Sequence, residues 1–250
     1  MMVFALLLLL AALAGIGVWA KFHGWFRHGN GREYSPSRLE PDPESPLAGK
    51  TIFCLGSSVT GGLSSCGISF VDYIARLGGC TMIKEAVSAS TLADISSRSY
   101  LRRLRRHPAV KRPIDCFLCQ LSTNDATFYS ALGRVSESFD PNDFDTKTSV
   151  GGMEAIIAFV RETWGCPIVF FTGTRYDNPR YHKLVNQLLR LEEKWGITVI
   201  DRWHDEAMDR LTQEERRLYM NDDVHPTMAG YLLWWTPVIQ RKLYDVFQSV

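Results

Sequence analysis

The residues that could carry out chemistry stand in two short motifs, one near each end of the chain. Ser58 ends the motif Gly56-Ser57-Ser58, and His225 lies three residues after Asp222, directly before Pro226. A serine hydroxyl is a weak nucleophile at neutral pH until a neighbouring base takes its proton, and histidine suits that task. A carboxylate can orient the imidazole and stabilise its charged form. These residue types predict acyl transfer through a serine nucleophile, provided that the fold brings them together.

The local sequence around each motif favours an exposed, well-placed side chain. Ser58 follows the apolar run Thr51–Leu55, and glycines at 56, 61 and 62 allow a sharp turn there. A serine between a strand and a helix lies beside backbone N–H groups that can hold an anion. The residue before a proline is disfavoured in the helical region, so His225 is expected in an extended turn within reach of Asp222.

Strand-like apolar runs alternate with amphipathic helical stretches from Thr51 onward. The predicted strands are Thr51–Leu55, Met82–Val87, Ile114–Leu121, Pro167–Thr172 and Ile197–Asp201. The predicted helices are Phe70–Leu77, Leu92–Leu104, Gly152–Trp164, Tyr181–Trp195 and Thr227–Phe247, the last interrupted at Pro237. This alternation predicts an α/β protein with a doubly wound, five-stranded parallel sheet. Ligands bind beyond the carboxyl ends of such strands, so Ser58, Asn124 and His225 are expected on one rim.

Composition limits the other functional classes. The chain has 250 residues, 46% of them hydrophobic, which suffices for one catalytic domain with a short appendage. The net charge of +1 and the lack of a basic stripe interleaved with aromatic residues give no indication of nucleic-acid binding. The basic cluster between Arg102 and Arg112 is interpreted as a solvated helix end, with contact to an anionic surface as the alternative.

The first twenty residues carry no charged side chain, and Val3 to Ala20 is almost wholly apolar. That length approaches the roughly 20 residues that span a bilayer. Residues 1–20 are therefore predicted to be a transmembrane anchor or a signal peptide, and the absence of a basic start favours the anchor. The expected location is the membrane through a single span, or secretion if the segment is cleaved. Residues 21–50, rich in Gly, Pro, Ser and charge, are predicted to be a linker to a domain at 51–250.

The cysteines indicate core positions rather than a metal site. Cys54, Cys116 and Cys119 lie in apolar runs, and the C-x-x-C pair at 116 and 119 has no second pair or histidine to complete a metal site. Buried free thiols are expected at all three positions.

Taken together, the motifs resemble those of the SGNH (GDSL-type) hydrolase superfamily, from Thr51 to the C-terminus. Its Gly-Asp-Ser block is similar to Gly56-Ser57-Ser58, its Gly-x-Asn-Asp block to Ser122-Thr123-Asn124-Asp125, and its Asp-x-x-His-Pro block to residues 222–226. The resemblance implies a three-layer α/β/α flavodoxin-like sandwich. This sandwich is expected to follow the N-terminal hydrophobic helix that the apolar residues 1–20 predict. It also implies esterase, lipase or carbohydrate-deacylase activity, with no cofactor and no metal.

Roles for individual residues follow from the motifs and the resemblance. The catalytic residues are predicted to be Ser58, Asp222 and His225, and the oxyanion hole is assigned to the Ser58 N–H, the Ala89 N–H and the Asn124 side chain. The expected substrate is an ester, with an O-acyl or O-acetyl group on a carbohydrate or lipid. The loops Gly133–Thr148 and Thr174–Tyr181 are expected to form the pocket walls.

Three departures from the family pattern leave other functions open. Ser57 replaces an aspartate, Ala89 replaces a glycine that donates to the oxyanion, and Ser122 replaces a glycine. The first alternative is a catalytically weak carbohydrate-binding or scaffold protein on the same fold. The second is a metal-dependent phosphoesterase that uses Asp222, Asp223 and His225.

Overall fold

The computed structural model describes residue 12 and residues 14–21, 23–24 and 27–248. At its centre is a sheet of five parallel strands in the order β2-β1-β3-β4-β5. The strands are β1 (Thr51–Gly56), β2 (Thr81–Ala86), β3 (Cys116–Gln120), β4 (Ile168–Phe171) and β5 (Thr198–Ile200). The predicted α/β class and parallel five-stranded sheet are confirmed, and each predicted strand is found.

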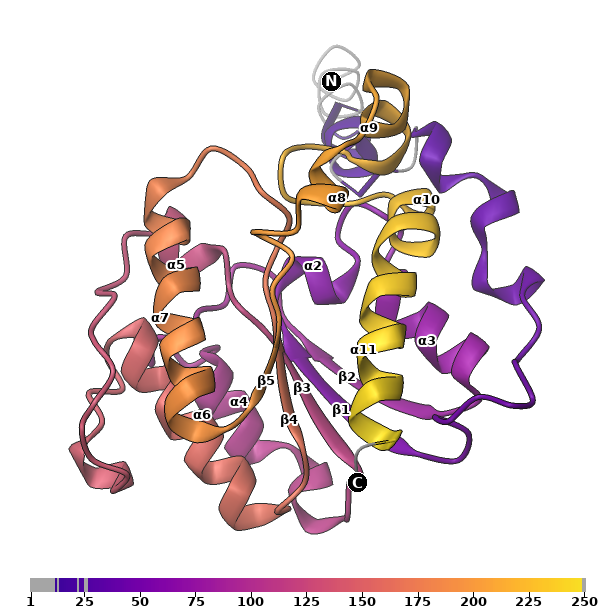
Figure 1. The fold of residues 1–250 in the computed structure, drawn as a ribbon. Coiled ribbons are helices and arrows are strands. Elements are labelled where there is room, and N and C mark those ends of the chain that lie inside the picture. The colour runs from indigo at the N-terminus through magenta and orange to yellow at the C-terminus, as the bar shows by residue number, and fades with distance from the viewer. Residues whose placement is uncertain (1–11, 13, 22, 25–26, 249–250) are drawn as a thin grey trace, which may run out of the picture.

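Helices cover both faces of this sheet, which gives three layers (Figure 1). The helices are α2 (Ser58–Gly61), α3 (Phe70–Gly78), α4 (Tyr100–Arg106), α5 (Asn124–Thr127), α6 (Ser149–Thr163), α7 (Pro179–Trp195), α8 (Glu206–Asp209), α9 (Gln213–Tyr219), α10 (Met228–Gly230) and α11 (Thr236–Gln248). Helices α4, α6 and α7 pack on one face, and α3 and α11 pack on the other.

Continuous apolar strands suit this arrangement because both faces of the sheet are buried. In β3, Phe117 and Cys119 belong to the core under α4, α6 and α7, whereas Cys116 and Leu118 belong to the opposite core. Burial raises the pKa of the thiols of Cys54, Cys116 and Cys119 far above the ordinary value, so these thiols are inert. The expected buried free cysteines are confirmed.

Two helices differ from their predicted extents. The stretch expected as a helix over Leu92–Leu104 is helical only in α4. The N–H groups of Leu92 and Ala93 bond the Asp125 carboxylate and the Asp94 N–H bonds the Thr146 carbonyl, and these tertiary contacts hold residues 92–94 in a loop. In the last helix the irregularity is a π-helical turn at Tyr231–Trp235, just before Pro237. Proline has no N–H for the normal bond to the preceding turn, and a π turn accommodates that loss.

Residues 27–50, expected as a linker, pack against the domain. Leu47 is fully buried in the core beside α3. The Tyr73 hydroxyl donates to the Tyr34 carbonyl at 2.7 Å, and Arg76 Nε donates to the Leu39 carbonyl at 2.6 Å. Figure 1 shows this indigo segment running from the upper rim of the sheet down the outer side of α3.

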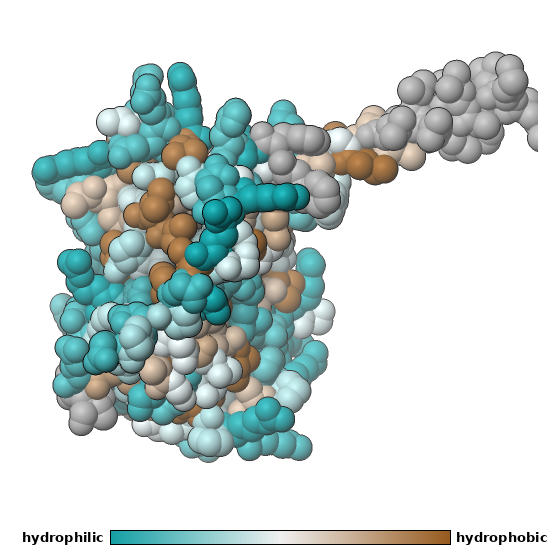
Figure 2. Space-filling model, turned by 90° about the vertical axis from the view of Figure 1, so that its right-hand side faces the viewer, coloured by the Kyte–Doolittle hydropathy of each residue, from teal (hydrophilic) through white to brown (hydrophobic). Residues whose placement is uncertain are grey.

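The residues before this segment are described only in part. Residues 14–21 are helical, and Ile16, Val18 and Trp19 on this helix are exposed. Most of the apolar run expected to cross or enter a membrane lies outside the described residues. Within the described residues, no helix has the length and apolarity needed for a membrane span. The domain surface in Figure 2 is mainly polar, with smaller apolar patches toward its upper half.

Candidate active site

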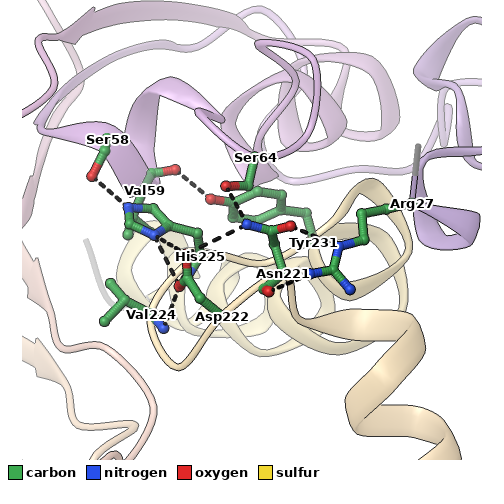
Figure 3. A network of polar contacts seen from close by, with 9 residues as sticks. All are labelled: Arg27, Ser58, Val59, Ser64, Asn221, Asp222, Val224, His225 and Tyr231. Carbon is green, nitrogen blue, oxygen red and sulfur yellow. Dashed lines mark hydrogen bonds and ion pairs between the residues drawn. The ribbon is translucent and has the colours of Figure 1, made fainter. Parts of the chain in front are cut away.

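Ser58 and His225 meet at the carboxyl edge of the sheet although they lie far apart in the chain. Ser58 is the first residue of α2, directly after β1, and His225 lies in the turn between α9 and α10. The Ser58 Oγ and His225 Nε2 atoms are 2.8 Å apart (Figure 3). Ser58 is buried, and the His225 side chain is 20% exposed, so the pair is sheltered yet reachable.

Asp222 holds the other side of the imidazole ring. Its two carboxylate oxygens lie 3.0 Å and 2.9 Å from His225 Nδ1, and Oδ1 also accepts from the N–H groups of Val224 and His225. Because a carboxylate only accepts, Nδ1 carries the hydrogen and the neutral ring leaves Nε2 free to accept from Ser58. The ring is thus oriented as a general base toward the serine.

The pKa of Asp222 is set by opposing effects. Burial raises it, but hydrogen bonds from the His225 ring and from two backbone N–H groups outweigh burial and lower the pKa from 3.8 to about 2. A carboxyl group whose pKa is lower in the folded protein than in the unfolded chain stabilises the fold at pH values above its unfolded-state pKa. This stabilisation is lost as the pH falls through the folded-state pKa.

We therefore expect the free energy of unfolding to fall between about pH 5 and pH 2, partly because of Asp222. The Asp222 side chain is 47% exposed, so solvent screening limits its share to about 1 kcal/mol. Urea unfolding of the wild type and of Asp222→Asn across this range measures that share. Identical pH dependence in the two proteins would contradict it.

The turn before the nucleophile is fixed by a residue that the sequence did not single out. Gln120, at the end of β3, accepts from the N–H groups of Ser57 and Thr60 at 2.9 Å and 3.1 Å, and its Nε2 donates to Ser57 Oγ at 3.0 Å. A Cβ on Gly56 would lie 1.9 Å from Thr60 Oγ1, so only glycine fits there. Ser57 therefore replaces the family aspartate as a fully buried partner of Gln120.

The three groups assigned to the oxyanion hole from the sequence are all able to donate a hydrogen bond. Within the described part of the chain, neither the Ser58 N–H nor the Ala89 N–H has a hydrogen-bond acceptor. Asn124 Nδ2 donates to the Ser90 carbonyl at 2.9 Å, which orients the amide and leaves its second hydrogen available. Ser122 Oγ donates to the same carbonyl at 3.0 Å, so this replacement of a family glycine supports the loop.

Removing the Asn124 amide tests its assignment as an oxyanion donor. We expect Asn124→Ala to lower kcat for p-nitrophenyl acetate by roughly 100-fold with little change in KM, because such a donor binds mainly the transition state. Steady-state kinetics on folded protein measures both constants. An increase in KM at unchanged kcat would instead make Asn124 a substrate-binding residue.

Ala89 occupies a backbone conformation that glycine prefers. Its φ is +61°, in the left-handed region. An L-residue there costs about 1–2 kcal/mol, and glycine loses about 0.5–1 kcal/mol more entropy on folding. The family glycine at this position thus has a physical reason, and the alanine retains its backbone N–H.

We expect Ala89→Gly to raise the free energy of unfolding by about 0.5–1 kcal/mol without loss of turnover. Thermal and urea unfolding measure the first effect, and kcat the second. Ala207→Gly, at an exposed position of helix α8, is the matched control and is expected to destabilise the protein. Destabilisation by Ala89→Gly would show that the left-handed backbone is not strained.

Arg103 joins the turn at Gly56 to the loop after β2. Its guanidinium donates to the Gly56 carbonyl at 2.8 Å, to Ser90 Oγ at 3.2 Å and to Glu85 Oε1 at 2.6 Å. Arg102 pairs with Asp94 at 2.6 Å. The interpretation of the basic cluster as a wholly solvated helix end is wrong for these two residues, whereas Arg105 and Arg106 are exposed.

Asp125 is a structural partner of the same loop. It is fully buried and accepts from the N–H groups of Leu92 and Ala93 and from the Ser149 hydroxyl at 2.8–3.0 Å. Burial raises the pKa of its carboxyl despite these bonds. Asp125 thereby connects the loop after β2 to the start of α6, beside Asn124.

A small pocket is lined by the chain neighbours of the serine and the histidine. Val59 and Val224, the neighbours of Ser58 and His225, line it together with Trp235, Thr174 and Tyr176. Its cavity volume of about 10 Å³ leaves room for about one water molecule. Trp235 is buried against this space, and the Arg202 guanidinium stacks on its ring at 3.3 Å from the ring centre.

Of the two loops expected to form the walls, one does so. Thr174 and Tyr176 come from the loop Thr174–Tyr181, as expected. The loop Gly133–Thr148 instead lines a separate hollow with Glu154, where Lys194 bonds Glu154 and the carbonyls of Ser136 and Ser138. That buried ion pair holds the loop against α6 and α7, away from the pocket beside Ser58.

The remaining polar residues do not join the site. Asp223 is exposed, as are His182 and His204, whose Nε2 atoms lie 3.4 Å apart beyond β5. Among the described residues, no group of three or more histidine, cysteine or acidic side chains is arranged to hold a metal ion.

Solved structures share this fold. A protein from Lactobacillus plantarum matches with a TM-score of 0.65 at 19% identity, over 81% of this chain and 98% of its own. An aryl esterase from M. smegmatis matches with a TM-score of 0.55 at 15% identity, over 79% and 99%. Est24, a carbohydrate acetylesterase from Sinorhizobium meliloti, matches with a TM-score of 0.54 at 16% identity, over 78% and 99%. A search of curated proteins found no match.

A family model agrees with the fold and the motifs. The model of the GDSL-like Lipase/Acylhydrolase family matches residues 54–233, a range that includes Ser58, Asn124 and His225. The match covers well over half of the chain and confirms the resemblance drawn from the motifs. The chain belongs to the GDSL-like lipase/acylhydrolase family and is an ester hydrolase.

Proposed function

We propose that this chain is a serine esterase that removes a short acyl group, such as acetyl, from a carbohydrate or lipid. The observation that carries the proposal is the hydrogen-bonded series from Ser58 through His225 to Asp222, at 2.8 Å and 2.9–3.0 Å. This arrangement pairs a nucleophile with an oriented base, as acyl transfer through a serine requires.

In the first half of the reaction, Ser58 Oγ attacks the ester carbonyl carbon while its proton passes to His225 Nε2. The carbonyl oxygen becomes an oxyanion, for which the Ser58 N–H, the Ala89 N–H and the Asn124 amide are the donors. Collapse of the tetrahedral intermediate breaks the bond to the alcohol, which leaves with the proton from His225. An acyl–Ser58 ester remains.

In the second half, His225 takes a proton from water, and the resulting hydroxide attacks the acyl carbonyl carbon. The bond to Ser58 Oγ breaks, and the serine regains its proton from His225 as the acid leaves. Asp222, ionised at neutral pH because its pKa is about 2, stabilises the imidazolium formed in each half.

The small pocket favours a short acyl group. Its lining combines the apolar Val59, Val224 and Trp235 with the polar Gln120, Thr123 and Thr174, and space for about one water molecule suits a methyl group better than a long chain. We place the alcohol side of the ester toward solvent, where Ala89 on the loop after β2 is exposed. The alcohol can therefore be much larger than the acyl group.

A panel of p-nitrophenyl esters, from acetate through butyrate and octanoate to laurate, tests the acyl preference on the full chain. We expect kcat/KM to be highest for acetate and to fall as the chain lengthens. Acetylated sugars and acetylated glycerolipids then compare the two classes of alcohol. A maximum at octanoate or laurate would overturn the short-acyl assignment while leaving the esterase intact.

The replacements at positions 57 and 89 favour one other function, a catalytically weak binding protein on the same fold. The two functions differ in one observable property. An organophosphonate ester reacts irreversibly with an activated serine, so an adduct on Ser58 supports the enzyme. Folded protein that binds a glycan and forms no adduct supports the binding protein.

A further inference from the structure

The segment before the catalytic domain reaches the loop that carries Asp222 and His225. Arg27 donates from Nε to Oδ1 of Asn221 and from Nη2 to the Asn221 main-chain oxygen, both at 2.8 Å (Figure 3). One guanidinium thus fixes both the side chain and the backbone of the residue that directly precedes Asp222.

Asn221 in turn contacts the site on its other side. Its Nδ2 donates to Ser64 Oγ at 3.1 Å and lies 3.5 Å from Asp222 Oδ2. Its main-chain N–H donates to the His225 carbonyl at 2.9 Å, which closes the turn. Asn221 therefore links Arg27, the segment after α2 and the Asp222–His225 turn.

A second contact seats the same segment. Asn30 accepts from the Met228 N–H at 2.7 Å and donates to the Ser64 carbonyl at 2.9 Å. Between Arg27 and Asn30, Gly29 packs so closely that a Cβ would lie 2.0 Å from the Leu218 carbonyl oxygen. The backbone near Arg27 is therefore held against the helices on both sides of the turn.

We infer that Arg27 is a positioning residue of the esterase site, which fixes Asn221 and, through it, the Asp222 carboxylate relative to His225. The inference rests on the proposed function. Displacing a catalytic group by about 1 Å can lower a rate by roughly 100-fold, so a fixed carboxylate matters even where its support is exposed. Lysine is a poor substitute because a single ammonium lacks the planar fork that reaches both Asn221 oxygens.

The test uses the full chain with Arg27→Ala, Arg27→Lys, Asn221→Ala and the double variant Arg27→Ala/Asn221→Ala. We expect Arg27→Ala to lower kcat for p-nitrophenyl acetate by about tenfold at unchanged KM. The kcat of Arg27→Lys should lie between those of Arg27→Ala and the wild type. The double variant should be no slower than Asn221→Ala alone, because Arg27 acts through Asn221. Arg32→Ala, an exposed arginine in the same segment, is the control and should match the wild type.

A second readout does not depend on turnover. The NMR resonance of the His225 Nδ1 proton reports its hydrogen bond to Asp222, and it should shift or broaden in Arg27→Ala and stay unchanged in Arg32→Ala. Wild-type kcat and an unchanged resonance in Arg27→Ala would overturn the inference. A lower kcat that is fully explained by a smaller folded fraction of the variant, as measured by thermal unfolding, would also overturn the inference. A wild type that lacks esterase activity would overturn the proposed function, and the resonance would still decide the role of Arg27.

Discussion

Replacing Ser58 with alanine is expected to reduce hydrolysis of p-nitrophenyl acetate by about 10⁴-fold or more. The hydroxyl is the only protein group in the proposed mechanism that forms a bond to the acyl carbon, and His225 Nε2, 2.8 Å away, has no other proposed proton donor in the acylation step. The substitution removes one oxygen atom and keeps the backbone N–H that starts α2. Steady-state rates measure the effect, with circular dichroism to check the fold.

Ser97→Ala is the matched control for Ser58→Ala. Ser97 is an exposed serine in the loop before α4 and should retain full activity. Burst kinetics adds a second test, because the acyl–enzyme step releases p-nitrophenol before steady state is reached. A Ser58→Ala variant that stays folded and turns over at a rate close to the wild type would remove Ser58 from the mechanism.

The second large effect is expected from Asp222→Asn, which should lower kcat by roughly 10³-fold or more. An asparagine amide can present its NH₂ group to Nδ1 and so favour the tautomer in which Nε2 carries a hydrogen. That tautomer cannot take the Ser58 proton. The variant also lacks the negative charge that stabilises the imidazolium.

Asp223→Asn is a control within the same motif, since Asp223 is exposed next to Asp222. It should keep wild-type kcat and KM. A loss of activity in Asp223→Asn equal to that in Asp222→Asn would contradict the assigned roles. Activation of either variant by added divalent cations would instead favour the phosphoesterase alternative.

The sheet and the meeting of Ser58 with His225 could be predicted because both depend on order along the chain. Apolar runs bounded by polar residues predicted the strands, and carboxyl ends of parallel strands share one rim. Ala89 is assigned to the oxyanion hole by the family resemblance alone, and that role stays a prediction. Only the structure shows that Ala89 has a positive φ, which is the physical reason for a glycine at this position in the family.

Other features could not be predicted because they depend on tertiary contacts between distant residues. Gln120 in β3 and Arg103 in α4 support the turn before Ser58. The local sequence instead favours a core position for Gln120 and a solvent-exposed position for Arg103. The apolar spacing of Leu92–Leu104 favours a helix, yet contacts to Asp125 and Thr146 hold residues 92–94 in a loop. Residues 27–30 have the composition of a linker and still pack against the catalytic turn.

The most direct measurement is the mass and location of the adduct left by an organophosphonate ester on the folded full chain. We expect one phosphonyl group per chain, mapped by peptide mass spectrometry to Ser58. The adduct should be absent in Ser58→Ala and should form far more slowly in His225→Ala. Modification at another residue, or no modification of protein shown to be folded, would contradict a nucleophile at Ser58 activated by His225.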